Sequence, residues 1–157
     1  LEFRRVLFRS LKKIKEPGFK GLLAAKMSQI IKEDINISLE ILNDIELLHI
    51  ETFDLCRIIG ILLDNAREAV KECEEKIIAI SIVQDGPLNI TILNSYNDEV
   101  NITNIYQKGY SSKGENRGIG LSNVRNIINE KYPNVLLNTH IENHMFIQDL
   151  WIETKAK

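Results

Sequence analysis

The chain has 157 residues, of which 44% are hydrophobic and 27% charged, and its formal net charge is −2. These values are typical of one globular domain that is large enough to bury a core. The slight negative charge argues against a nucleic-acid-binding surface, which normally shows a basic excess. No apolar run approaches the roughly 18 residues of a membrane span. The two cysteines, Cys56 and Cys73, have no metal-ligand spacing around them.

The first ten residues, Leu1 to Ser10, differ in composition from the rest of the chain. Three arginines crowd into this stretch, whereas the remainder favours lysine. Its apolar residues do not share the periodicity of the next segment of the chain. We therefore expect a segment that is foreign to the native protein, similar to a translated library adaptor, and set it aside from the fold. The alternative is a genuine basic helix.

The first half of the domain is expected to contain two helices separated by a strand. Residues 19–33 have apolar side chains at helical spacing. Residues 35–41 alternate between isoleucine or leucine and polar residues, which is typical of a half-buried strand. After a connection without clear signal, a long amphipathic helix is expected from 52 to about 72, with Thr52 or Asp54 as its N-cap.

The second half is expected to contain two pairs of strands with a helix between the pairs. The expected elements are strands at 78–82 and 88–92, a helix at 119–130, and strands at 135–141 and 145–154. Asp85-Gly86-Pro87 and Asn143-His144 supply the turns within the pairs. The stretch from Ser95 to Arg117 is polar and long for a connection. This order predicts a two-layer α/β sandwich, in which helices cover a mixed sheet.

The first candidate site residue is Asn65, in the long helix. It lies three residues after Leu62 and seven after Ile58, so it projects from the edge of the buried stripe, whereas Asp64 and Arg67 point toward more exposed directions. An asparagine at the margin of a core face can offer its amide oxygen to a hard cation whose other ligands are mainly phosphate oxygens. Taken alone, the position is better explained by an ordinary helix residue that faces water.

The second candidate is a glycine-rich stretch, Lys108 to Leu121, that leads into the third helix. Gly118 and Gly120 allow backbone amides to approach a bulky anion closely. The third helix presents free N–H groups and its positive dipole end to the same anion, and Lys113 can add a mobile charge. The long polar stretch before the helix is typical of a lid over a ligand. A plain connecting loop explains the glycine pair at least equally well.

The third candidate is Asn94, which ends a predicted strand together with Ser95. Its side chain could form a hydrogen bond with a ligand from the strand end. A turn-initiating asparagine is the simpler local interpretation.

In combination, the three candidates occur in the order found in the GHKL (Bergerat-fold) ATPases. The chain resembles in particular the Agr-type quorum-sensing receptor kinases, through the run DLCRIIGILLDN at 54–65 and the run KGYSSKGENRGIGL at 108–121. PGFKGLL at 17–23 looks like that family's junction between dimerisation helices and catalytic domain. The resemblance covers roughly Leu11 to the C-terminus. It implies the end of the junction at 11–18 and a GHKL catalytic domain at 19–157.

The resemblance implies a site for ATP and Mg²⁺, with a role for each matching residue. It implies Asn65 as a magnesium ligand, Asn94 near the adenine, Gly118 and Gly120 at the phosphates, and Lys113, Gly114 and Leu121 within the same ATP-binding set. Asn94 stands where most GHKL proteins have an aspartate followed by glycines, and both are absent here, as the Agr-type branch leads one to expect. An asparagine oxygen can still accept a hydrogen bond from the adenine amino group.

The kind of reaction is indicated by one further position. Hydrolysing GHKL proteins carry a glutamate four residues before the motif asparagine to activate water, and here that residue is Ile61, which cannot act as a base. Phosphoryl transfer to a protein histidine needs no such water. The resemblance therefore implies the catalytic domain of a sensor histidine kinase in two-component signalling. An anti-sigma-type serine kinase and a degenerate nucleotide-binding module used only for protein contacts are the alternatives.

The phosphorylated histidine is expected outside this sequence. His49, His140 and His144 lie near predicted strand ends or turns, and none has the helical context of a phosphoacceptor. The expected partners are a dimerisation domain of the same full-length protein, which carries the acceptor, and a response regulator, with no nucleic acid. The expected location is the cytoplasmic side of a membrane-anchored bacterial receptor, which is held to the membrane through upstream segments.

Overall fold

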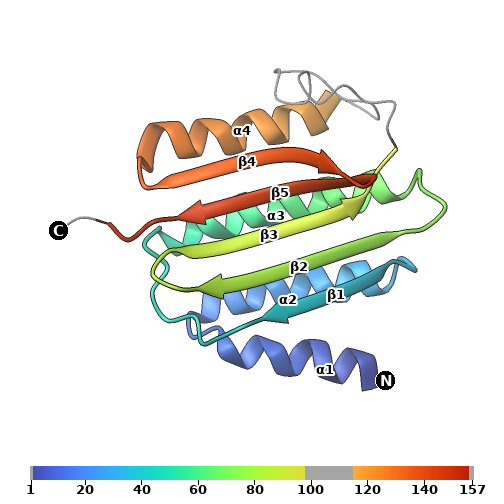
Figure 1. The fold of residues 1–157 in the computed structure, drawn as a ribbon, viewed down its shortest axis with the longest axis horizontal. Helices are drawn as coiled ribbons and strands as arrows, with labels where there is room; N and C mark the ends of the chain where they lie inside the picture. Colours follow the sequence, from blue (N-terminus) through green and yellow to red (C-terminus); the bar gives the residue numbers. More distant parts are fainter. Residues whose placement is uncertain (1, 98–114, 156–157) are drawn as a thin grey trace.

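The protein folds into a sheet layer and a helix layer (Figure 1). The computed structural model describes residues 2–97 and 115–155, so Lys113, Gly114 and most of the expected lid lie outside the described residues. In chain order the elements are α1 (Glu2–Ser10), a 3-10 turn η1 (Leu11–Lys13), α2 (Pro17–Ile31), β1 (Asn36–Ile41), α3 (Thr52–Val70), β2 (Ile77–Gln84), β3 (Leu88–Ser95), α4 (Glu115–Lys131), β4 (Val135–Glu142) and β5 (Met145–Ile152). The predicted two-layer α/β sandwich is confirmed.

The five strands form one mixed sheet in the order β1-β2-β3-β5-β4. β1 is parallel to β2, and all other neighbours are antiparallel. The β4–β5 turn places Asn143 and His144 at φ 51° and 62°, the left-handed pair that a two-residue hairpin turn requires. Gly86, at φ 76°, turns the β2–β3 hairpin. Both predicted turns are therefore confirmed.

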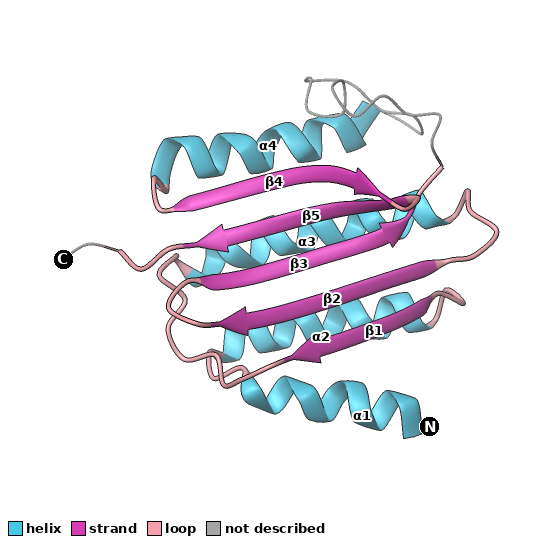
Figure 2. Ribbon diagram, viewed as in Figure 1, coloured by secondary structure: helices cyan, strands magenta, loops and turns pink. Residues whose placement is uncertain are grey.

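One face of the sheet carries the hydrophobic core. Alternate residues of each strand point toward the helices, and those of β2 and β3 are the isoleucines and leucine that the alternation predicted: Ile78, Ile80, Ile82, Leu88, Ile90 and Ile92. The apolar stripe of α3 packs against them, and α2 and α3 lie behind the sheet (Figure 2). Removal of this apolar surface from water is the main force that joins the two layers.

The other face of the sheet carries a hydrogen-bonded polar group centred on Asp149. Its Oδ1 accepts hydrogen bonds from Asn89 Nδ2 over 2.7 Å and from Thr91 Oγ1 over 2.9 Å, and its Oδ2 accepts one from Trp151 Nε1 over 3.0 Å. These residues alternate with the buried ones along β3 and β5. A hydrogen-bonded polar group of this kind is typical of the sheet face that contacts water.

Helix α1 lies in the first ten residues, which the sequence led us to set aside from the fold; their origin outside the native protein stays a prediction. Residues 2–10 form a helix whose Leu7 is 3% exposed and belongs to the core, and Phe8 packs against it. A short helix at a chain end gives too few apolar positions for its period to be read from the sequence. The contact with the domain therefore becomes visible in the tertiary structure alone.

The ends of two helices also differ from the sequence prediction. α3 begins at Thr52, but its N-cap residue is Glu51, without a capping bond from the side chain, and Asp54 is buried in another interaction. α4 begins at Glu115 instead of 119, so Gly118 and Gly120 lie inside the helix. Glycine lowers helix propensity, so the sequence placed the start of this helix after the two glycines. The packing of its later turns stabilises the helix and extends it to Glu115.

Candidate functional site

The three candidate segments come together at one end of the sandwich. The C-terminal half of α3, the end of β3 and the start of α4 lie at the same end of the molecule (Figure 1). α3 packs against both β3 and α4. Residues that are far apart in the sequence, Asn65, Asn94 and Gly120, are brought to this end by the fold.

Gly120 lies directly against the face of α3 that carries Asn65. A β-carbon built on Gly120 would lie 3.9 Å from Asn65 Nδ2 and 3.4 Å from Ile61 Cγ2. Both distances are ordinary contacts, so the backbone of α4 comes within one methyl group of the half-buried Asn65 side chain. The structure thus joins the predicted helix asparagine to one of the two predicted glycines.

The neighbours of Asn65 on α3 are tied by ion pairs to α2 and to the residues that follow it. Lys26 Nζ donates to Asp64 Oδ1 and Oδ2 over 2.9 and 3.0 Å, and Arg67 Nε lies 3.3 Å from Glu33 Oε1. The Arg67 side chain is only 15% exposed, so the expectation that it points to solvent is wrong. The two pairs fix the turn of α3 from which Asn65 projects.

Asn94 is an internal residue of β3 on the side that faces the helices. It is 2% exposed, and its Nδ2 donates a hydrogen bond to the carbonyl of Ser95 over 2.8 Å. The Ser95 hydroxyl accepts a hydrogen bond from the amide of Ile77 over 3.1 Å, which holds the strand end against β2. The position is thus a buried strand site, and the simpler interpretation of a turn-initiating asparagine is wrong.

Two of the remaining predicted residues lie in α4. Gly118 is in the first turns of the helix. Leu121 is 8% exposed and packs in the hydrophobic core, so its side chain anchors the helix. Lys113 and Gly114 lie outside the described residues.

The same end of the sheet holds polar and aromatic side chains that the sequence analysis missed. Gln148 of β5 is buried among the helix-facing residues, and its Oε1 accepts a hydrogen bond from the hydroxyl of Thr139 on β4. Tyr96 stacks on Phe146, with ring centroids 5.5 Å apart. The signal for Gln148 was present, because this glutamine interrupts an otherwise apolar face of the last strand.

The opposite end of α3 and α4 is closed by a buried carboxylate. Asp54 Oδ2 accepts a hydrogen bond from Lys131 Nζ over 2.8 Å and another from the Tyr132 hydroxyl. The hydrogen bond from Lys131, then that from Tyr132, lowers the pKa of Asp54, and the same contact with Asp54 raises the pKa of Lys131. Burial and the bond to Asp54 raise the pKa of Tyr132 to about 12. These contacts fasten the first turn of α3 to the last residue of α4.

The donors in the described residues fit a cation that a bound anion helps to hold. Within residues 2–97 and 115–155, no group of three or more His, Cys, Asp or Glu side chains could hold a metal ion. Asn65 offers one amide oxygen beside the start of α4, where helix amides favour an anion. A magnesium ion commonly has few protein ligands and takes the rest from phosphates and water. The residues present therefore fit Mg²⁺ bound together with a polyphosphate.

This fold and the family comparison define the class of protein. The GHKL domain family matches residues 50–153, a span that contains Asn65, Asn94 and both glycines. The chain belongs to this family. Over 85 residues, it is 38% identical to the sensor protein CitS of Bacillus subtilis (strain 168), a match that covers 52% of this chain and 16% of CitS.

Solved structures of histidine kinases have the same fold. The catalytic domain of the histidine kinase ThkA superposes with a TM-score of 0.69 at 19% identity, covering 90% of this chain and 94% of that one. ThkA in complex with the response regulator protein TrrA gives a TM-score of 0.71 at 17% identity, covering 90% of this chain and 40% of that one. The fold is therefore that of histidine kinase catalytic domains. In the described part of the chain, no helix has the length and apolar character needed to cross a membrane.

Proposed function

We propose that this chain is the ATP-binding catalytic domain of a sensor histidine kinase. It binds ATP with Mg²⁺ and transfers the γ-phosphoryl group to a histidine on a dimerisation domain of the same full-length protein. The observation that carries the proposal is the approach of Gly120 to Asn65 within a GHKL-family fold, at the same end of the sandwich as the buried Asn94 (Figure 1). Together with the start of α4, these residues provide a metal ligand, free helix amides for the phosphates and a polar group for the base.

Each side chain has a defined part in nucleotide binding. Asn65 supplies an oxygen to the magnesium ion, which neutralises charge on the phosphates when it is bound. The amides at the start of α4 and its dipole stabilise the phosphate oxygens, with Gly118 and Gly120 keeping the approach open. Asn94 contacts the adenine. Lys113 and Gly114 complete the phosphate site.

The absence of a base at position 61 supports transfer over hydrolysis. Ile61 Cγ2 would be 3.4 Å from a β-carbon on Gly120, so an apolar side chain lies where α3 faces α4 near Asn65. An isoleucine cannot take a proton from water. Phosphoryl transfer to an imidazole nitrogen requires positioning and charge stabilisation, which this site supplies without a water-activating residue.

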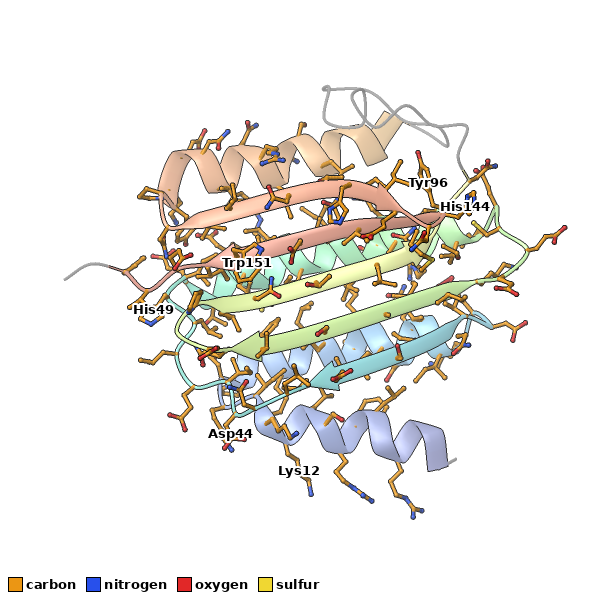
Figure 3. All side chains as sticks on the ribbon, viewed as in Figure 1. Lys12, Asp44, His49, Tyr96, His144 and Trp151 are labelled. Carbon is orange, nitrogen blue, oxygen red and sulfur yellow. The ribbon has the colours of Figure 1, made fainter. Side chains whose placement is uncertain are left out.

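The positions of the three histidines support an acceptor elsewhere in the full-length protein. His49 precedes α3 and His144 is in the β4–β5 turn (Figure 3). His140 lies in β4. All three are described residues, and none is on a helix. A kinase of this kind acts between a dimerisation domain and a response regulator, and the structural similarity to ThkA bound to TrrA supports the second partner.

We further propose the kind of signalling system to which this kinase belongs. The sequence runs at 54–65 and 108–121 support an Agr-type, quorum-sensing receptor whose upstream segments anchor it in a bacterial membrane. The domain itself is then cytoplasmic, where ATP is available, and it has no nucleic-acid partner.

Labelled ATP tests the proposal directly. The isolated chain should bind ATP and Mg²⁺ yet acquire no label, and addition of the dimerisation domain of its full-length protein should yield acid-labile, base-stable phosphate on that domain. Acid-stable label on a serine would favour the anti-sigma-type kinase. Lack of any nucleotide binding would favour the degenerate module, and fast ATP hydrolysis would contradict the kinase assignment.

A further inference from the structure

An aromatic pair stands beside Asn94 at the proposed nucleotide end. Tyr96, just after β3, stacks on Phe146 of β5 with ring centroids 5.5 Å apart and an interplanar angle of 26°. Tyr96 is found with the β4–β5 turn residue His144 at one end of the sheet, whereas Trp151 and His49 lie at the other (Figure 3). Both rings of the pair are half-buried, so part of each is accessible.

The pair lies on the same side of the sheet as Asn94. Phe146 is the direct cross-strand partner of Asn94, so their side chains share a face. That face is the one directed toward α3, because Asn94 continues the row of buried residues of β3. Tyr96 follows Asn94 by two residues and reaches the Phe146 ring. The three side chains therefore lie together on one face at this end of the sheet, with a buried amide and two half-buried aromatic rings.

Such a surface has the chemistry that recognises a nucleobase. An amide side chain can form hydrogen bonds with the edge of a base, and aromatic rings bind its flat face by stacking. Neither feature is needed to bind the phosphates, because the N-terminal turns of α4, near Asn65 and Gly120, are proposed to bind them. Recognition of the nucleotide therefore has two separate parts, with the base bound near the aromatic pair and the phosphates bound near α4.

We propose that Tyr96 and Phe146 form the wall that contacts the adenine base, and so determine affinity for the base. This inference rests on the proposed function, because it assigns further residues to the same nucleotide site. The rings hold each other in place, so the wall is formed before the ligand binds and little rotamer freedom is lost on binding.

The test compares a ligand that has a base with one that lacks it. Binding of Mg-ATP and of Mg-triphosphate (inorganic) is measured by calorimetry for the wild-type chain, Tyr96→Leu, Tyr96→Phe and Phe146→Leu. Loss of stacking in Tyr96→Leu should weaken ATP binding by about 5- to 100-fold and leave triphosphate binding unchanged. Tyr96→Phe keeps the ring and should retain wild-type affinity for both ligands.

The matched control is Phe53→Leu, which removes an exposed ring in the first turn of α3, at the far end of that helix from Asn65. It should bind both ligands as the wild type does. Equal loss of ATP and triphosphate binding in Tyr96→Leu would reduce the pair to a structural role and overturn the inference, as would unchanged ATP binding. If Tyr96→Leu fails to fold, the same comparison of ATP affinity with triphosphate affinity in Phe146→Leu decides. A wild-type chain that binds no nucleotide would instead overturn the proposed function itself.

Discussion

Lys131, the last residue of α4, donates a hydrogen bond over 2.8 Å to the buried carboxylate of Asp54 in the first turn of α3. The two helices are antiparallel neighbours, so this pair fixes one end of their interface, and Asn65 and Gly120 lie toward the other. Interactions that stabilise the helix layer are therefore separated along α3 from those proposed to bind nucleotide. Variants at the two ends should have different effects.

Tyr132→Phe should destabilise the fold and change its response to alkali. The variant loses the hydroxyl that donates to Asp54, and loss of a hydrogen bond to a charged group costs about 1.5–3 kcal/mol. Burial raises the pKa of Tyr132 from 10.0 to about 12, so the folded state keeps the proton more tightly than the unfolded state. Its contribution is complete below pH 10 and is lost as the pH rises through 12.

Urea unfolding of both proteins at several pH values measures this effect. The difference in free energy of unfolding between wild type and Tyr132→Phe should stay constant from neutral pH to about 10 and shrink toward pH 12. ATP affinity should not change, because Tyr132 lies at the far end of α4. A difference that is independent of pH up to 12 would contradict the assigned role of the phenol.

Asn65→Ala should remove the magnesium dependence of nucleotide binding while the fold remains intact. Asn65 is half-buried at the edge of α3, so its truncation leaves no large cavity. A fluorescent ATP analogue is titrated with Mg²⁺ and with EDTA, and the variant should lose about tenfold or more in the magnesium series, about 1.4 kcal/mol or more. Asn126→Ala, at an exposed asparagine of α4, serves as the control for loss of an asparagine side chain from a helix. Equal affinities of Asn65→Ala and wild type in Mg²⁺ would exclude Asn65 as the metal ligand.

Gly120→Ala should raise stability and lower nucleotide affinity. Alanine is favoured over glycine inside a helix by about 1 kcal/mol, and its β-carbon would meet Ile61 and Asn65 at ordinary contact distances. The added methyl group would nevertheless fill the gap between α4 and Asn65 and so narrow the approach of the phosphates to this side chain. Thermal melting and ATP titration measure the two effects.

The matched substitution is Gly21→Ala in α2, where a β-carbon would have no neighbour within 4 Å. It should give the same gain in stability with unchanged ATP affinity. If Gly120→Ala and Gly21→Ala behave alike in ATP binding, Gly120 does not lie against the bound phosphates.

Leu7→Ala should lower the free energy of unfolding. Leu7 is 3% exposed within the core, and truncation of a buried leucine costs about 2–5 kcal/mol. Chemical unfolding compares it with Arg9→Ala, an exposed position on the same helix. A loss below about 0.5 kcal/mol, the usual size of a surface effect, would show that α1 is not part of the folded domain.

Patterns that repeat along the chain were predictable, and contacts between distant segments were not. The alternation of β2 and β3 and the period of α3 gave the sheet, the helix layer and the core, because each element buries one side. Asp54, by contrast, looked like a helix cap, since its partners Lys131 and Tyr132 are 77 and 78 residues away.

The residues of the candidate site also fall into those that could be predicted from the sequence and those that could not. Asn65, Asn94 and Gly120 could be selected from their places on predicted elements, together with the family resemblance. Tyr96 and Phe146 could not be paired, because the register of β3 against β5 decides which residues meet. The start of α4 was misplaced because local glycine content outweighed packing that occurs later in the helix.

Helix α1 also has a consequence for self-association. β1 is an edge strand of the sheet, and α1 packs against it (Figure 1). An open edge of this kind presents backbone donors and acceptors to which a strand of another molecule can add. Removal of residues 1–10 would therefore leave a site for intermolecular strand pairing, and the shortened chain should form aggregates at concentrations at which the full chain stays monodisperse.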